Sequence, residues 1–169
     1  MSKKYLILLA VLLSSIAEAS ETTSISENER EYVGLLAGGS SNQNGGQNMT
    51  AFGATLGGQV TRYLGVGIFG SRSEQTNSNF SVLTTEMNFY LGNFHFGPEG
   101  GFSWTTPSGA NSTVFQNNTT ASVVLGPQAG YDFKVARAFS IGAEAHYLII
   151  QSQNKDSTQA LVSLKYWFQ

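Results

Sequence analysis

In the stretch Phe139–Ile149, FSIGAEAHYLI, apolar residues alternate with small, polar or charged ones from Phe139 to Tyr147. Side chains two positions apart share one face of a strand, so this alternation predicts a strand with one apolar and one polar face. The polar face carries two ionisable groups, Glu144 and His146. A strand of about ten residues is long for a soluble β-sandwich and suits a tilted strand that crosses a membrane.

The same two-residue period continues from Glu31 onward, and helical periodicity is absent from this part of the chain. We therefore predict an all-β protein with eight strands. These strands cover residues 31–40, 48–60, 64–73, 79–91, 93–105, 119–134, 138–151 and 157–168.

The connections between these strands alternate in length. Three are tight: Thr61–Tyr63, Gly92–Asn93 and Val135–Arg137. Those after the first, third, fifth and seventh strands are longer and hydrophilic: SSNQNGGQN, SEQTNSN, TPSGANSTVFQNN and SQNKDS. Short turns at one end and longer loops at the other are typical of an antiparallel up-and-down transmembrane barrel, with the turns in the periplasm and the loops outside. A soluble barrel has no need of this asymmetry.

Aromatic residues indicate which face points outward. In a soluble ligand-binding barrel the apolar face would point inward, with aromatic residues spread through the cavity. Here most aromatic residues of the apolar faces gather near the short turns, like the girdle of a membrane barrel. We predict membrane-interface positions for Phe89, Phe94, Tyr131, Phe133, Phe139, Tyr166 and Phe168 at that end and for Trp104 at the other. The polar face then lines the lumen.

The N-terminus has the three parts of a secretory signal peptide. Lys3 and Lys4 form a basic start, Tyr5–Ile16 is apolar, and Ala17–Ala19 offers small residues for cleavage. The apolar run is shorter than the roughly 20 residues of a membrane-spanning helix, so a cleaved peptide is favoured over an anchor. We predict a signal peptide over 1–19, a disordered periplasmic leader over 20–30 and a single barrel domain over 31–169.

The charge and cysteine content of the chain limit the classes of partner and the kinds of cross-link that it can have. Without residues 1–19, seven of the nine basic and ten of the eleven acidic residues remain, which leaves a net charge of −3. Binding of nucleic acid normally requires a basic surface, so we predict no nucleic-acid partner. The chain has no cysteine and must hold together without disulfides. No motif indicates a cofactor.

The chain resembles the small eight-stranded outer-membrane barrels of Gram-negative bacteria, the OmpA-like and OmpX-like group. The resemblance rests on YVGLLAGGS after the signal peptide, on GPEGGF and GPQAGY, on FSIGAEAHYLI, and on the closing strand ALVSLKYWF. It implies location in the outer membrane, contact with its lipid, and recognition of the last strand by the barrel-insertion machinery. Members of the group usually end on an aromatic residue, whereas Gln169 follows Phe168 here.

The predicted lumen face carries an unusual set of polar and ionisable residues: Glu86, His95, Glu99, Gln128, Asp132, Lys134, Glu144, His146 and Lys165. Counting outward from the connections places Glu86 opposite Glu99, and Glu144 opposite Lys165 with Gln128 nearby. Glu144 and Lys165 would form a salt bridge. The like charges of Glu86 and Glu99 require a nearby cation, or one carboxyl must hold a proton.

Paired carboxylates also occur in glycosidases. However, no cleft or substrate-binding aromatic residues accompany Glu86 and Glu99, and the interior of a small barrel is only wide enough to be filled by side chains. Lipid deacylases of the PagL-like type use a His and a Ser two residues apart on the lipid-facing side, but Leu148 stands two residues after His146. The two histidines have no ligand cluster at metal-site spacing. We therefore predict no enzyme, no catalytic residue and no metal site.

Two similar stretches, FGPEGGF (Phe96–Phe102) and LGPQAGY (Leu125–Tyr131), each place a proline within a predicted strand. Proline removes a ladder hydrogen bond and normally marks an edge or a bulge. Because a closed barrel has no edge, we predict bulges near Pro98 and Pro127. No helix follows FGPEGGF, so it is not a phosphate-binding loop.

These observations predict a non-enzymatic outer-membrane barrel with a side-chain-filled lumen, acting in outer-membrane integrity or surface interaction. Its loops, above all the one near Thr106–Asn118, could contact an extracellular ligand. The alternative is a narrow pore or a transporter for small solutes or hydrophobic molecules, because glycines on the lumen face could leave voids that hold water.

Overall fold

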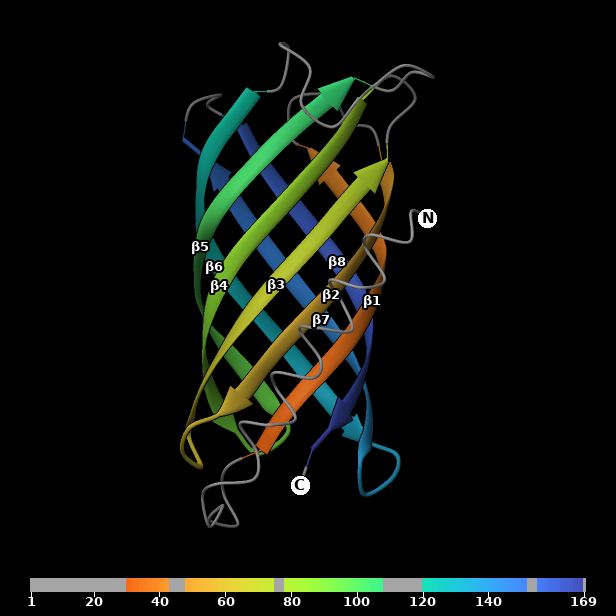
Figure 1. Cartoon of the computed structure of the whole chain (residues 1–169), viewed down its shortest axis with the longest axis vertical. Coiled ribbons are helices and arrows are strands. Elements are labelled where there is room, and N and C mark those ends of the chain that lie inside the picture. Colours follow the sequence, from red (N-terminus) through yellow and green to blue (C-terminus); the bar gives the residue numbers. More distant parts are fainter. Residues whose placement is uncertain (1–29, 43–47, 75–77, 108–119, 152–154, 169) are drawn as a thin grey trace, which may run out of the picture.

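The computed structural model describes residues 30–42, 48–74, 78–107, 120–151 and 155–168, and all eight strands close into one antiparallel barrel (Figure 1). The strands are β1 (Arg30–Asn42), β2 (Asn48–Gln59), β3 (Leu64–Glu74), β4 (Ser78–Leu91), β5 (Phe94–Pro107), β6 (Thr120–Lys134), β7 (Phe139–Ile150) and β8 (Lys155–Trp167). Every predicted strand is confirmed, with each boundary within two residues. No helix in the described ranges has the length and apolar character needed to cross a membrane.

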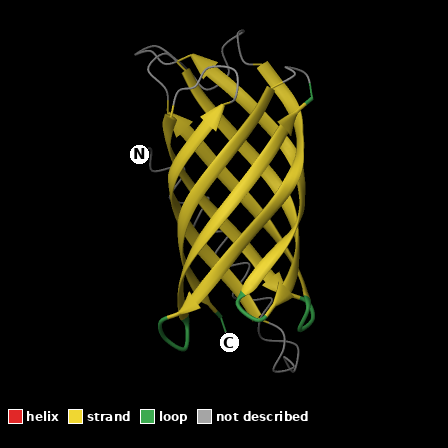
Figure 2. Cartoon of the chain, turned by 180° about the vertical axis from the view of Figure 1, so that it is seen from behind, coloured by secondary structure: helices red, strands yellow, loops and turns green. Residues whose placement is uncertain are grey.

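Each strand pairs with its neighbours in sequence, and β1 pairs with β8 to close the ring. Closure gives every strand a partner on both sides and leaves no exposed sheet edge. Figure 2 shows the strands tilted around the barrel, with the short turns after β2, β4 and β6 at the same end as the end of β8. The predicted signal peptide, residues 20–29 of the predicted leader and the central parts of the four longer connections lie outside the described residues, whereas Arg30, the last residue of that leader, begins β1.

The short turns are built from local backbone contacts. The amide of Val60 donates to the carbonyl oxygen of Leu64 at 2.9 Å, and that of Val135 donates to Phe139 at 3.1 Å. Gly92 has φ of 65°, a left-handed conformation that glycine adopts without a Cβ penalty. This residue therefore allows the two-residue connection between β4 and β5.

The outer face of the barrel is apolar. Large hydrophobic side chains point away from the axis on all eight strands, with exposed fractions that reach 68% for Leu35 and 61% for Phe102. A soluble barrel would bury this face, whereas hydrocarbon lipid is its natural surrounding. Near the turn end the outward aromatic residues also contact one another, as in the pairs Phe139–Tyr166 and Tyr131–Phe133.

The inner face is filled in tiers. Close to the loop end lies an apolar cluster of Phe80, Val82, Val124, Leu148 and Ile150. A second cluster, formed by Leu36, Ala51, Phe69 and Leu161, lies farther along the lumen. Charged side chains fill the part toward the turn end, where Tyr32, Tyr90 and Trp167 are also buried. These apolar and aromatic lumen residues were missed because the lumen face was expected to be polar throughout.

The prediction of bulges near the two prolines is wrong. Pro98 and Pro127 face each other directly in the β5–β6 pair. The β4–β5 ladder is interrupted beside Pro98 and the β6–β7 ladder beside Pro127, yet the register is the same on both sides of each interruption. No residue is inserted, because the adjacent glycines let the backbones approach: a Cβ at Gly97 or Gly126 would collide with a carbonyl oxygen of the neighbouring strand.

Candidate functional site

The ionisable side chains of the lumen form the candidate site. Eight of the nine residues predicted for it are at least nine-tenths buried: Glu86, His95, Glu99, Gln128, Asp132, Glu144, His146 and Lys165. Lys134 has the alternation phase of the lumen face but is exposed. It is the last residue of β6, beyond the point where neighbouring strands enclose the lumen.

The charged side chains fall into two groups along the lumen. The group nearer the turn end, called the lower group, is centred on Lys165. Its ammonium nitrogen lies 2.9 Å from Oε1 of Glu144 and 3.1 Å from Oδ2 of Asp132. His95 approaches the same Asp132 oxygen through Nδ1 at 3.5 Å, and the ring of Tyr32 lies 5.0 Å from the Lys165 nitrogen. One lysine therefore serves two buried carboxylates, and this shared pairing reduces the cost of taking the charges out of water.

The expected Glu144–Lys165 salt bridge exists, but the expected register was wrong. In the β7–β8 pair, Lys165 stands opposite Ser140 and Glu144 stands opposite Leu161. The long side chain of Lys165 spans this offset, which counting across an irregular loop could not show. Gln128 donates its hydrogen bond to Asn88 rather than to this pair.

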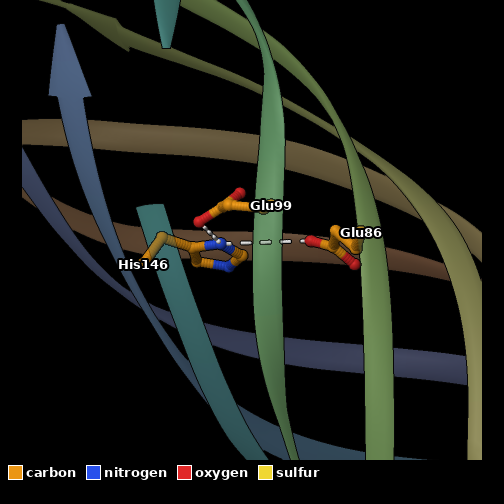
Figure 3. Close-up of side chains that lie close together, drawn as sticks. All are labelled: Glu86, Glu99 and His146. Atoms are coloured by element: carbon orange, nitrogen blue, oxygen red, sulfur yellow. Dashed lines mark hydrogen bonds and ion pairs between the residues drawn. The ribbon is translucent and has the colours of Figure 1, made fainter. Parts of the chain in front are cut away.

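The upper group is centred on His146 (Figure 3). Glu86 and Glu99 are directly opposite each other on β4 and β5, as expected. Nδ1 of His146 lies 3.1 Å from Oε1 of Glu99 and 4.0 Å from Oε1 of Glu86. On the other side of the ring, Nε2 lies 3.6 Å from Oε2 of Glu144. His146 therefore connects the upper carboxylates to the lower group.

Two neighbours hold this arrangement in place. The ring of Phe69 stacks on that of His146 with a centroid separation of 4.1 Å and an interplanar angle of 11°. The hydroxyl of Thr84 donates to Oε2 of Glu99 at 3.0 Å. Phe69 and Thr84 were not among the predicted site residues, because neither contact is visible in the strand alternation.

The burial of the paired carboxylates bears on the glycosidase interpretation. Glu86 and Glu99 are 7% and 3% exposed. A saccharide could not reach between them without displacing the side chains that fill the lumen. The arrangement is suited to internal charge pairing or to holding a small cation.

Comparison with models of protein families and with curated protein sequences finds no match. Solved structures do match. Neisserial surface protein A is similar with a TM-score of 0.64 at 11% identity, over 82% of this chain and 96% of that one. The attachment invasion locus protein Ail of Yersinia pestis, solved with the heparin analogue sucrose octasulfate, has a TM-score of 0.51 at 15% identity, over 85% and 100%.

The N-terminal β-barrel domain of OprF from Pseudomonas aeruginosa has a TM-score of 0.51 at 13% identity, over 81% of this chain and 97% of that domain. This chain has the fold of the small eight-stranded outer-membrane barrels. At these identities the likeness concerns the fold alone. It confirms the predicted transmembrane barrel architecture and leaves the chemistry of the lumen to be judged from this chain's own residues.

Proposed function

We propose that this protein is a non-enzymatic barrel of the Gram-negative outer membrane that acts through its outer surface, in membrane integrity or surface interaction, and does not conduct through its lumen. The observation that carries this proposal is the filling of the lumen. Apolar clusters occupy the part toward the loop end, and buried ion pairs occupy the rest. A continuous water path would have to pass both.

The glycines of the lumen face support the closed state over the alternative pore. Space above these glycines is taken by neighbouring side chains. A Cβ at Gly34 would lie 2.9 Å from Lys165, one at Gly57 would lie 2.7 Å from the Tyr32 hydroxyl, and one at Gly65 would lie 2.8 Å from the Tyr90 ring. The glycines thus accommodate large neighbours, and the pore interpretation loses the voids on which it rested.

The proposal also implies three partners: membrane lipid, the barrel-insertion machinery and a ligand at the loops. Membrane lipid covers the apolar outer face, and the last strand with Tyr166 and Phe168 is the segment recognised by the barrel-insertion machinery. Surface contact falls to the four longer connections, whose charged residues are Glu74, Lys155 and Asp156, with a net charge of −1. Such loops favour a neutral, hydrogen-bonding ligand over a polyanion, in contrast to the sulfated ligand present in the Ail structure.

Conductance in planar bilayers tests the proposal. We expect the refolded barrel, shown to be folded by its altered gel migration without boiling, to give no steady channels. Steady single-channel currents that change on reversal of the Glu99 or Lys165 charge would contradict it and support the pore. Recovery of the protein as a soluble periplasmic species would contradict the membrane location itself.

A further inference from the structure

The two carboxylates of Glu86 and Glu99 pose a problem of charge. They stand directly opposite each other on neighbouring strands, and both side chains are buried. Like charges at opposed positions destabilise a sheet, and burial increases the cost because water no longer screens them. Lys165 contacts Glu144 and Asp132 instead, so it does not compensate this pair directly.

From this geometry we propose that Glu86, Glu99 and His146 bind one zinc ion inside the barrel. Each residue can offer one ligand atom, and the three atoms all lie within 4.8 Å of one another. Zinc–ligand bonds of about 2.0–2.2 Å in a tetrahedral site place ligand atoms roughly 3.4 Å apart, and three protein ligands would leave the fourth position to a water molecule. The separations from His146 Nδ1, 3.1 Å to Glu99 and 4.0 Å to Glu86, bracket that value.

An independent observation comes from the far side of the imidazole ring. Nε2 of His146 is buried and has no hydrogen-bond partner, although Oε2 of Glu144 lies only 3.6 Å away. Histidines that bind a metal through one nitrogen usually donate the proton of the other nitrogen to a carboxylate. With zinc at Nδ1, the Nε2 proton points to Glu144, and a small shift closes this bond.

Other contacts hold the proposed ligands before any ion binds. The Thr84 hydroxyl holds the second oxygen of Glu99, and the stacked ring of Phe69 fixes the plane of His146. Lys165 in turn anchors Glu144. Glu99 and His146 thus each have a neighbour that restrains them, and Glu144 beside His146 is itself anchored, which is the arrangement that tunes metal sites in proteins.

Charge balance also favours the ion. The buried lumen residues described here include four carboxylates, from Glu86, Glu99, Asp132 and Glu144, and a single lysine. With neutral histidines, as zinc binding at Nδ1 of His146 requires, these charges sum to −3, and a divalent ion reduces the excess to −1. Without the ion, a proton on His146 alone would reduce it only to −2. One imidazole nitrogen with two carboxylates suits zinc better than magnesium or calcium, which prefer all-oxygen ligands.

The site is enclosed, so the role of the ion is structural. Apolar side chains fill the lumen toward the loop end, and Tyr32, Tyr90 and Trp167 are buried toward the turn end. The ion would enter before the barrel closes and would then hold β4, β5 and β7 together. This inference does not depend on the surface function proposed above.

The test measures zinc in the folded barrel. Protein without a polyhistidine tag is treated with chelator while unfolded, refolded in detergent with zinc, and dialysed. Folding is confirmed by gel migration, and the metal is measured by elemental analysis. We expect about one zinc per wild-type chain and less than about a tenth of that for Glu86→Gln, which keeps the side-chain shape. Zinc-free wild type, or a folded Glu86→Gln that retains the wild-type amount, would overturn the proposal.

Glu74→Gln is the matched control, because Glu74 is an exposed glutamate that contacts Arg72. It should bind zinc as the wild type does, and loss of zinc in this variant would also contradict the assignment. Cobalt provides a measurement that needs no variant. Folded wild type should show the visible absorption of tetrahedral Co²⁺ with nitrogen and oxygen ligands, and an absorption no different from that of the unfolded chain would reject the site.

Discussion

The two ends of the lumen are filled by different physical means. Toward the loop end, Phe80, Val124 and Leu148 pack against one another without polar partners. Toward the turn end, space is filled by Lys165, Glu144 and Asp132, whose burial is tolerable only because each charge has a partner. Apolar packing tolerates exchange among side chains of similar volume, whereas a charge network depends on every member.

Loss of Lys165 should give the largest decrease in the free energy of unfolding. Lys165→Met keeps length and apolar stem but leaves Glu144 and Asp132 without their cation, at a cost of about 4 kcal/mol in the free energy of unfolding. Urea titration of the barrel in lipid vesicles measures this cost. Lys134→Met is the control, since Lys134 is exposed at the end of β6 and should change stability by less than about 0.5 kcal/mol. Equal effects of the two variants would mean that the buried ion pairs do not stabilise the fold.

A cavity in the apolar cluster at the loop end should lower the free energy of unfolding by somewhat less than the loss of Lys165. Leu148→Ala removes a fully buried side chain from the loop-end cluster and should destabilise the barrel by about 3 kcal/mol. Because no charge is involved, the loss should be the same at low and high salt. The adjacent Ile149 faces outward, and Ile149→Ala tests whether the effect depends on the lumen side. A larger loss for Ile149→Ala in urea titrations would contradict the apolar plug.

A smaller loss in the free energy of unfolding is expected from a change in the barrel backbone, where β6 and β7 approach closely. Gly126→Ala introduces a Cβ that would meet the carbonyl oxygen of Tyr147, and we expect a loss of about 2 kcal/mol from the resulting backbone shift. Gly39→Ala is the control, because its Cβ would meet nothing closer than 3.8 Å. If both variants unfold at the same urea concentration, the close strand approach beside Pro127 has no energetic importance.

The proposed zinc site allows one further, weaker perturbation. Glu144→Gln leaves all three proposed ligands in place but removes the carboxylate next to Nε2 of His146. Zinc affinity, measured by competition with a chelating dye during refolding, should fall about 10–100-fold. Unchanged affinity would show that Glu144 serves only Lys165, and the two charge groups would then be energetically separate.

The sequence by itself determined the strands and the outer face of this protein. A two-residue period depends only on neighbours along the chain, and glycine at position 92 meets the local demand of a tight turn. The outward apolar face follows from the same alternation. The opposition of Glu86 and Glu99 was predictable too, because a two-residue turn fixes the register of the strands that it joins.

Only the tertiary structure decided how the lumen is filled. Leu148 and Ile150 continue the phase of Glu144 and His146, so alternation alone could not show where the polar part of the lumen ends. His146 meets Glu86, Glu99 and Phe69 from strands that are distant in sequence, and Lys165 reaches Glu144 across a register that the last loop obscured. These contacts depend on closure of the barrel and on the tilt of its strands, which bring together side chains that no local pattern connects.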